Sequence, residues 1–326
     1  MSAADPIPTI DLGHWTGGDP AARRAVAAQV DDALSHAGFL LVRGHGVTHE
    51  LRAEVRAAAR EFFALPPQIK ERYSVRVGGR GWLAVGAEGN GYAEGTVTPP
   101  DLKESWTAAA DTPTGDPEID DFWFQPNRWP SEVPRLQQAA ARYLAHMRSL
   151  ADDLLRLLAA ALDQPEDFFT RHTGHPTYGF NINWYPGVPV VGEPLPGQYR
   201  IGPHTDFGTV TLLDREPGQG GLQVYLDPAD GGPGWQDAPF DPQALTVNIG
   251  DLLARWTGGR WTAGRHRVLA PSPQAPEEDL MSLVYFYECD PHTTVSPLPA
   301  PIGRIDYEPV DSSAYLRAKL EAIAIA

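Results

Sequence analysis

The sequence predicts an α+β fold, mostly β, in which a helical N-terminal half supports a β-rich C-terminal half. Two observations carry this prediction. Apolar residues recur at helical spacing in three segments before residue 162. From about residue 177 the pattern changes to short runs of strand-forming residues separated by Gly and Pro turns. No linker of disordered composition separates the halves, so we expect one folded unit whose strands form a sandwich or barrel.

The amphipathic segments predict helices at residues 20–37, 49–64 and 131–162. Asp19 is a candidate N-cap for the first helix, and Gly38 would end it before a buried strand at 39–44. Ser131 is the expected cap of the longest helix, which has an apolar face throughout. A helix of that length is expected to pack against a sheet.

The C-terminal half contains the predicted strands. Residues 74–130, rich in Gly, Pro, Trp and Asp, are expected to form long loops with short strands. The clearest strand-like runs after them are 178–186, 208–214, 220–226, 244–253, 266–270 and 281–288.

Composition excludes several classes of protein. The chain has 326 residues, a net charge of -16 and a single cysteine, Cys289. One cysteine excludes an internal disulfide framework and thiolate-rich metal sites, so any metal must use imidazole and carboxylate ligands. The acidic charge argues against a nucleic-acid partner. With no long apolar run and no signal-peptide pattern, we expect a cytoplasmic protein that binds neither membrane nor nucleic acid; the oligomeric state is not predicted.

The segment PHTDFGTV places His204 and Asp206 two residues apart. In a strand, such residues project to the same face, so an imidazole and a carboxylate could bind one ion. Two histidines and one carboxylate are the facial triad of non-haem Fe(II) oxygenases. Taken alone, such a pair is more often a structural polar turn than a pair of ligands. The best third ligand is His266, which opens a strand, whereas His292 follows one and the other histidines lie in the N-terminal half or its loops.

Several segments in order resemble the isopenicillin N synthase-like family of Fe(II)- and 2-oxoglutarate-dependent oxygenases. They are IPTIDL, HAGFLLVRGHGV, DLKESW, HTDFGTVTLL, GGLQVY, VNIGDLLARWTGGRWTAGRHRVLAP and YFYE. The resemblance covers roughly residues 7 to 300 and implies a double-stranded β-helix (jelly-roll) core. It implies that His204, Asp206 and His266 bind Fe(II), with 2-oxoglutarate and O2 as co-substrates. It also implies that Asn183 and Tyr185 contact 2-oxoglutarate.

The sequence departs from the family at the co-substrate signature Arg-x-Ser. Ser282 is present, but Leu280 stands where the arginine that binds the far carboxylate of 2-oxoglutarate is expected. A charge-assisted hydrogen bond contributes about 1.5–3 kcal/mol, so the loss matters. Arg200 and Arg215 are candidate replacements by strand parity, and a surface ion pair or a structural role is the alternative for each.

The substrate is expected to lie across the mouth of the jelly roll. By resemblance, candidate substrate-contacting residues are Arg80, Trp82, Tyr92, Lys103, Trp106 and Phe286. An ion pair between Lys103 and Glu104 is the structural alternative for that segment.

The expected function is oxidation of a small molecule, by hydroxylation, desaturation or cyclisation, in bacterial secondary metabolism such as antibiotic biosynthesis. The alternatives are an isopenicillin N synthase-type oxidase without 2-oxoglutarate and a non-catalytic binding protein on the same fold. The expected regions are an N-terminal dioxygenase region, a supporting helix, the jelly-roll oxygenase core and a tail with a helix, at residues 1–130, 131–176, 177–300 and 301–326.

Overall fold

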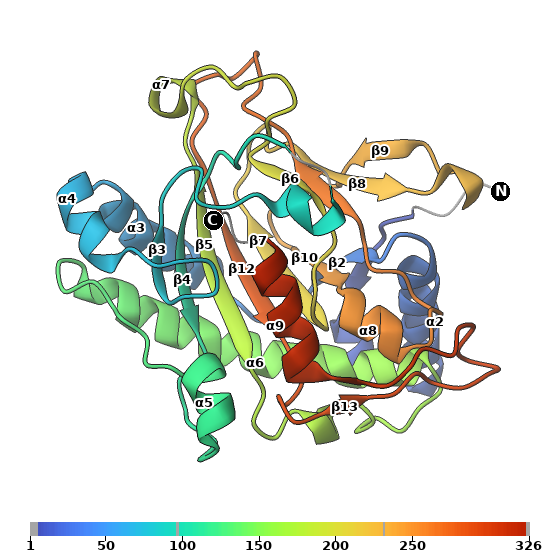
Figure 1. Ribbon diagram of the computed structural model, residues 1–326. Coiled ribbons are helices and arrows are strands. Elements are labelled where there is room, and N and C mark those ends of the chain that lie inside the picture. Colours follow the sequence, from blue (N-terminus) through green and yellow to red (C-terminus); the bar gives the residue numbers. More distant parts are fainter. Residues whose placement is uncertain (1–5, 96–97, 231, 324–326) are drawn as a thin grey trace.

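Two β-sheets face each other at the centre of the protein, and helices cover the outer side of the larger one (Figure 1). The computed structural model describes residues 6–95, 98–230 and 232–323. Within these residues, the larger sheet has the strand order β1-β2-β10-β7-β12-β5-β4-β3, and the smaller sheet has the order β6-β11-β8-β9. The predicted combination of helices and a β-rich C-terminal half is confirmed.

The elements have the following bounds. The strands of the larger sheet are β1 (Thr9–Asp11), β2 (Phe39–Arg43), β3 (Gly81–Leu83), β4 (Glu104–Ala109), β5 (Tyr178–Tyr185), β7 (Val210–Arg215), β10 (Leu245–Ile249) and β12 (Leu280–Tyr287). The other strands are β6 (Ile201–His204), β8 (Leu222–Leu226), β9 (Gly234–Asp237), β11 (His266–Val268), β13 (Thr294–Val295) and β14 (Val310–Asp311). The α-helices are α1 (Gly13–Thr16), α2 (Pro20–His36), α3 (His49–Phe63), α4 (Pro67–Lys70), α5 (Pro117–Trp123), α6 (Pro134–Ala161), α7 (Val188–Val191), α8 (Asp251–Trp256) and α9 (Ser312–Ala322).

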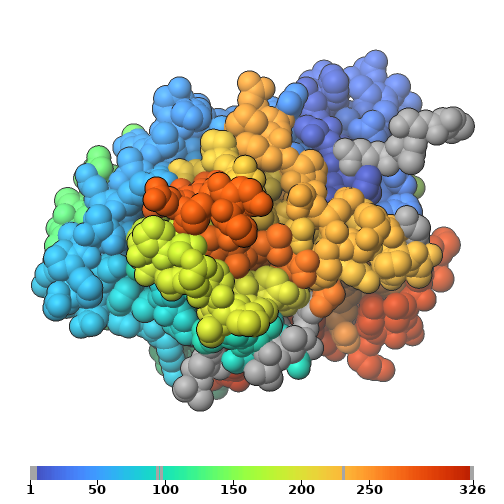
Figure 2. Space-filling model, turned by 90° about the horizontal axis from the view of Figure 1, so that it is seen from above, coloured from blue at the N-terminus to red at the C-terminus, as the bar shows by residue number. Residues whose placement is uncertain are grey.

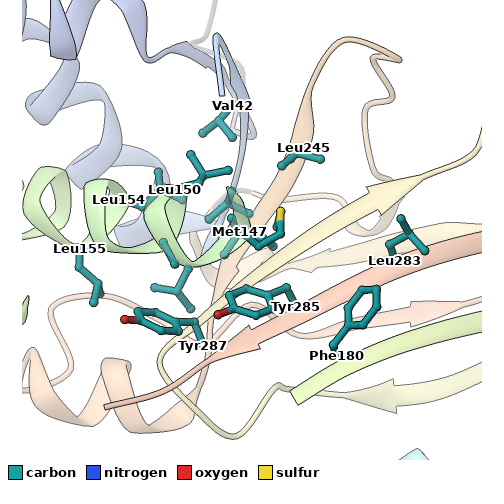
Figure 3. Close-up of a cluster of buried hydrophobic side chains, with 14 of the residues drawn as sticks. Val42, Met147, Leu150, Leu154, Leu155, Phe180, Leu245, Leu283, Tyr285 and Tyr287 are labelled. Atoms are coloured by element: carbon teal, nitrogen blue, oxygen red, sulfur yellow. The ribbon is translucent and has the colours of Figure 1, made fainter. Parts of the chain in front are cut away.

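The outer face of the larger sheet packs on the long helix α6. Alternate residues of a strand point to opposite faces, so Leu283, Tyr285 and Tyr287 of β12 join the apolar layer that includes α6. Each fully buried Leu of this layer contributes about 1.5–3 kcal/mol. Figure 3 shows the layer, with Val42, Met147, Leu150, Leu154, Leu155, Phe180, Leu245 and Leu283 labelled beside the two tyrosines.

The inner face of the same sheet carries a row of polar side chains. Its members are Ser105, Thr107, Asn181, Asn183, Thr211, Arg215, Asn248 and Ser282. Most of them are buried, and a buried polar group costs free energy unless it is hydrogen-bonded or serves a ligand. The smaller sheet covers this face, so the polar row marks the place to look for a site.

Two connections meet over one end of the sheets. In Figure 2 the yellow-green segment 186–200 lies beside the orange segment 269–279. The Val188 amide donates to the Pro276 carbonyl at 2.7 Å, which joins them. They follow β5 and precede β12, respectively, and thus border the end of the sheet where Tyr185 and Leu280 pair.

The helix predictions are confirmed except for one cap. Asp19 caps α2 by accepting from the Ala21 and Ala22 amides, and Gly38 follows the helix with φ +68°. The prediction that Ser131 caps the long helix is wrong. The helix α6 begins at Pro134 after Val133, without a side-chain cap, because the Ser131 hydroxyl lies against Tyr73 and Glu132 instead.

The predicted strand at 244–253 is also shorter than expected. The strand β10 ends at Ile249, and the helix α8 begins at Asp251. Gly250 separates them, and a Cβ atom there would lie 2.5 Å from the Gly208 carbonyl oxygen. An acidic residue in the first turn suits the positive end of the helix dipole, so the chain turns into a helix at this point. This turn between β10 and α8 places Gly250 against the loop that follows His204.

Candidate metal centre and the cavities beside it

The small sheet brings His204 and His266 together. His204 ends β6, His266 begins β11, and the antiparallel register places them opposite each other. Asp206 lies beyond β6, in the loop before β7. The strand-parity argument for the His-x-Asp pair therefore does not apply. A loop holds the carboxylate in place, and the Asp251 amide donates to the Asp206 carbonyl at 2.8 Å.

The three side chains converge on one point. The Nε2 atoms of His204 and His266 lie 3.6 and 3.9 Å from Oδ1 of Asp206. The Nδ1 atoms face backbone carbonyls, that of Gly202 at 2.8 Å and that of Gly264 at 2.9 Å. Such contacts fix the tautomer with the proton on Nδ1 and direct Nε2 toward a metal. All three ligand atoms lie within 4.8 Å of one another, which matches a shared ion.

The second oxygen of Asp206 is held by the large sheet. Oδ2 accepts from Thr211 Oγ1 and from Asn248 Nδ2, both at 2.6 Å. These bonds orient the carboxylate so that Oδ1 points to the two imidazoles. Neither residue was predicted from the sequence, although both lie on the same face of adjacent, paired strands.

Removing one of these bonds should weaken metal binding without removing a ligand. We expect Thr211→Val to lower the affinity for Fe(II) by about 10- to 100-fold, the usual effect of losing an outer partner. Thr211→Ser keeps the hydroxyl and should stay near wild type. Anaerobic metal titration measures both variants. Equal affinities for Val and Ser would contradict the orienting role.

Electrostatics of the metal-free site favour a cation. Burial alone would raise the pKa of Asp206, but the two neighbouring imidazoles hold it well below its ordinary range. Burial would lower the pKa of His204, and the hydrogen bond and charge of Asp206 reverse that and raise it. A divalent ion would replace these protons as the partner of the buried carboxylate. Two imidazoles and one carboxylate fit Fe(II) and leave open positions for a chelating co-substrate and O2.

The arginines that flank His266 point away from the metal centre. Arg265 lies over Tyr225, and Arg267 lies 4.1 Å from the centre of the Trp235 ring. No positive side chain from this strand thus competes with a metal.

A first cavity, of about 230 Å³, lies between strands β5, β7 and β12 of the larger sheet and the smaller sheet; we call it the Arg215 cavity. Tyr185, Ser282 and Leu280 line it together with Arg215. The Tyr185 hydroxyl and Ser282 Oγ are 3.1 Å apart. The cavity therefore contains Tyr185 and Ser282 of the co-substrate residues that the family resemblance implies, with the apolar Leu280 where an arginine was expected, whereas Asn183 lines a second cavity.

Arg200, the other candidate cation, does not line this cavity in the described structure. It is buried, and its guanidinium donates to the carbonyls of Gly220 and Glu278. The Glu278 carboxylate lies 3.6 Å away and balances its charge. Arg200 is thus occupied in holding the 218–220 turn to the start of β12.

A second cavity, of about 210 Å³, opens beside the metal centre and is called here the Phe286 cavity. His204 and Asp206 form part of its wall, and Phe286, Arg80 and Lys103 line it as predicted. Its apolar wall comes from the helices α5 and α9, and α9 crosses the front of the sheet in Figure 1. A helix was expected in the tail, but the sequence did not place it at the site, because Leu316 and Leu320 reach the cavity only through the tertiary fold.

Two of the predicted substrate residues lie elsewhere. Trp106 is fully buried on the helix side of β4, packed on Phe62. Trp82 donates to Glu104 at 2.8 Å, away from the cavity. The Tyr92 ring lies against Gly89, and Tyr92 is not among the described lining residues. The predictions for Trp106 and Trp82 are wrong, because both side chains lie on the helix side of the sheet, and the prediction for Tyr92 stays a prediction.

The ion pairs of the same segment also differ from expectation. Lys103 pairs with Glu88, whereas Glu104 pairs with Lys70 at 2.7 Å. Lys103 directly precedes β4 and Glu104 is its first residue; their side chains reach different partners on opposite sides of the sheet, so they do not pair with each other. Lys103 also donates to Ser105, which donates to Asn183 Oδ1, and both ends of this chain line the Phe286 cavity.

Glu288 is a further acidic residue in the Phe286 cavity that the sequence did not single out. Its carboxylate accepts from the Thr209 amide at 2.8 Å, and burial raises its pKa to about 8. In the unfolded chain this acid titrates near its ordinary value. Between the two values the folded protein holds a proton that the unfolded chain has released, so stability falls as pH rises.

We therefore expect Glu288→Gln to reduce the pH dependence of stability. Glutamine keeps an acceptor for the Thr209 amide and does not titrate. In denaturant unfolding of the metal-free protein, wild type should lose stability relative to this variant between about pH 5 and pH 8. Parallel pH profiles would contradict a raised pKa at this position.

Comparison with known proteins gives the class. Residues 177–288 match the 2OG-Fe(II) oxygenase superfamily, and residues 7–132 match the family described as non-haem dioxygenase in morphine synthesis N-terminal. The chain belongs to this family of Fe(II)- and 2-oxoglutarate-dependent oxygenases and is an enzyme of that class, with Fe(II), 2-oxoglutarate and O2 as its cofactors and co-substrates.

Two known enzymes are similar to this chain over most of its length. The chain is 43% identical over 298 residues to validamycin A dioxygenase of Streptomyces hygroscopicus subsp. limoneus, covering 91% of this chain and 80% of the relative. It is 30% identical to the 2-oxoglutarate-dependent dioxygenase tropC of Talaromyces stipitatus, covering 82% and 83%. Its relatives thus include an enzyme named for an antibiotic, in keeping with the expected role in secondary metabolism.

A solved structure confirms the fold. A full-length protein of Neurospora crassa, crystallised in complex with α-ketoglutarate and thymine, superposes with a TM-score of 0.81 at 25% identity, covering 97% of this chain and 96% of that one. The predicted jelly-roll core is confirmed. Within the described residues, no helix is long and apolar enough to cross a membrane.

Proposed function

We propose that His204, Asp206 and His266 bind the Fe(II) of this oxygenase and that a small polar molecule is oxidised in the Phe286 cavity. The observation that carries this proposal is the convergence of the three ligand atoms, with His204 and Asp206 in the wall of that cavity. When bound, Fe(II) and 2-oxoglutarate supply the oxidising power for attack on a C–H bond. The contribution of this chain is to orient the ligands, position the substrate and exclude water.

The co-substrate is assigned to the Arg215 cavity. The support for this assignment is that the paired strands β5 and β12 each contribute residues to both cavities. Asn183 and Tyr185 are two residues apart on β5, and the register places Asn183 opposite Ser282 and Tyr185 opposite Leu280. Asn183 lines the Phe286 cavity and Tyr185 lines the Arg215 cavity, so one wall serves the two adjoining spaces.

The substrate is proposed to be a secondary metabolite with polar groups. The Phe286 cavity combines apolar residues of α5 and α9 with the side chains of Asn181, Thr107 and Glu288. A molecule that offers both hydroxyl groups and a carbon skeleton suits such a wall. Validamycin A is the first compound to test, and hydroxylation is the first outcome to look for.

The remaining proposals concern organisation and location. We assign residues 1–130 to the N-terminal region, 131–176 to the supporting helix and its connection, 177–300 to the oxygenase core and 301–326 to the tail with α9; residues 1–5 and 324–326 lie outside the described residues. A single buried thiol, Cys289, supports a reducing cytoplasm, and the net charge of -16 supports a small-molecule substrate without nucleic acid.

The test is 2-oxoglutarate turnover with a defined substrate. Protein loaded with Fe(II) is incubated with 2-oxoglutarate, O2 and validamycin A, and succinate and product mass are measured. We expect substrate-stimulated succinate and a product with one added oxygen atom. Succinate that validamycin A does not stimulate would contradict this substrate, and succinate formation that persists in a His204→Ala variant would contradict the metal assignment.

A further inference from the structure

Arg215 is a cation in the wall of the proposed co-substrate cavity, and its guanidinium forms no ion pair with any carboxylate of the described residues. It is the last residue of β7, and the β7–β12 register places it directly opposite Ser282. Residues opposite each other in antiparallel strands share a face, so Arg215, Ser282 and the Tyr185 hydroxyl line the same cavity. The guanidinium donates to the Pro239 carbonyl and lies 5.3 Å from the centre of the Phe240 ring.

The carboxylates around Arg215 are all engaged elsewhere. Asp214 faces the other side of β7 and pairs with Arg52 and Arg56. The Glu216 carboxylate accepts hydrogen bonds from both terminal nitrogens of Arg60. Among the described residues, no carboxylate lies within ion-pair distance of Arg215.

The acids on the neighbouring elements are likewise occupied. Asp237 of β9 accepts from Gln223 at 3.0 Å. Glu278, before β12, accepts from the Gln219 amide and lies near Arg200. Burial is the one cause that lowers the pKa of Arg215, to about 10, and no opposing charge raises it. A buried cation without a counter-ion is costly, so this arrangement favours a negatively charged ligand.

The usual position of the cation is filled by an apolar side chain. Leu280 packs with Tyr185 and Ile201 in a small buried cluster at the edge of the same cavity. Both Leu280 and Arg215 border the Tyr185–Ser282 pair, one along β12 and the other across from it on β7. The positive charge absent from position 280 is thus present on the neighbouring strand β7, at a level two residues closer to the metal end of the sheet.

The distance along β7 suits this role. Thr211, which orients the metal ligand Asp206, lies four residues before Arg215 on the same face. At about 3.4 Å per residue the two positions are roughly 13 Å apart. A five-carbon dicarboxylate that starts at the metal and an arginine side chain that reaches toward it fill such a span together.

We propose that Arg215 binds the far carboxylate of 2-oxoglutarate in place of the arginine that the family carries at position 280. This proposal rests on the proposed function, because it assumes that 2-oxoglutarate occupies the Arg215 cavity. Tyr185 and Ser282 provide hydroxyl donors beside the guanidinium. The cavity selects a dicarboxylate over a monocarboxylate through this one charge.

Binding to the Fe(II)-loaded protein without O2 tests the proposal directly. The visible absorption band of a 2-oxo acid chelated to Fe(II) reports binding without turnover. The probes are 2-oxoglutarate and 2-oxovalerate, in which a methyl group replaces the far carboxylate. We expect Arg215→Gln to weaken 2-oxoglutarate binding by about 10- to 100-fold and to leave 2-oxovalerate binding near wild type. Arg215→Lys should keep much of the preference for 2-oxoglutarate over 2-oxovalerate. Arg267→Gln, which changes a residue outside the cavity, should keep all of that preference.

A double variant that moves the positive charge from β7 to β12 provides the second part of the test. Adding Leu280→Arg to Arg215→Gln returns the cation to the position it has in the family and should restore the preference for 2-oxoglutarate. Fe(II) affinity and the unfolding midpoint of each variant establish that it is folded. A full preference for 2-oxoglutarate in folded Arg215→Gln or Arg215→Met would overturn the proposal. Wild-type protein that binds Fe(II) but no 2-oxoglutarate would instead overturn the proposed function on which it rests.

Discussion

Asp206→Ala is expected to abolish Fe(II) binding and 2-oxoglutarate turnover. The carboxylate provides the one negative charge of the proposed ligand set, and its Oδ1 faces both imidazoles at 3.6 and 3.9 Å. Loss of an outer partner already costs about 10- to 100-fold, so loss of a ligand should exceed about 100-fold. Anaerobic Fe(II) titration and a succinate assay measure the two effects.

The matched control removes a negative charge elsewhere. Glu277 is exposed on the connection before β12, and Glu277→Gln should bind Fe(II) as wild type does. If Asp206→Ala also kept wild-type affinity for Fe(II), the assignment of the metal centre would be wrong.

The largest effect on stability is expected at Asp214. Its carboxylate is 1% exposed and pairs with Arg52 at 3.2 Å and Arg56 at 2.9 Å, which joins the helix α3 to β7. Asp214→Ala leaves the buried Arg52 guanidinium without its counter-ion and leaves Arg56 with only Glu216, 3.7 Å away. Breaking a buried pair from one side costs about 3–5 kcal/mol in the free energy of unfolding.

Denaturant unfolding measures this loss against an exposed pair on the same helix. Glu54 of α3 pairs with Arg142 at the surface, and Glu54→Ala should cost at most about 1 kcal/mol. Similar small losses for the two variants would show that the Asp214 cluster does not anchor the helix.

The sequence could predict the proposed metal ligands, which the structure brings together, because the pattern that contains them is short. His204 and Asp206 are two residues apart, and His266 follows a turn and opens a strand, so the family resemblance located all three. The loop that places Asp206 was not predictable, because its position depends on contacts with Gly250 and Asp251 more than 40 residues away.

The choice between Arg200 and Arg215 also required the structure. Strand parity placed both arginines on plausible faces. What separates them is the partner of each guanidinium, which depends on how the 218–221 turn and the residues before β12 pack. The register that sets Arg215 opposite Ser282 is a property of two strands about 65 residues apart in sequence and cannot be derived from either alone.

The wrong prediction at Trp106 has a simpler cause. Lys103 and Trp106 were both expected in the cavity, yet residues an odd number of positions apart in one regular strand point to opposite faces. Ser105 and Thr107 face the site, so Trp106 must face the helices. The alternation of side-chain direction along 103–107 could have been derived from the sequence alone. It excludes the prediction that Lys103 and Trp106 both line the cavity.

A crystal structure of the protein with Mn(II) and 2-oxoglutarate tests the central claim most directly. We expect the ion on His204 Nε2, His266 Nε2 and an oxygen of Asp206, and the far carboxylate of 2-oxoglutarate within hydrogen-bond distance of the Arg215 guanidinium and Ser282 Oγ. A metal bound by other residues, or a far carboxylate that contacts a different cation such as Arg200, would contradict it.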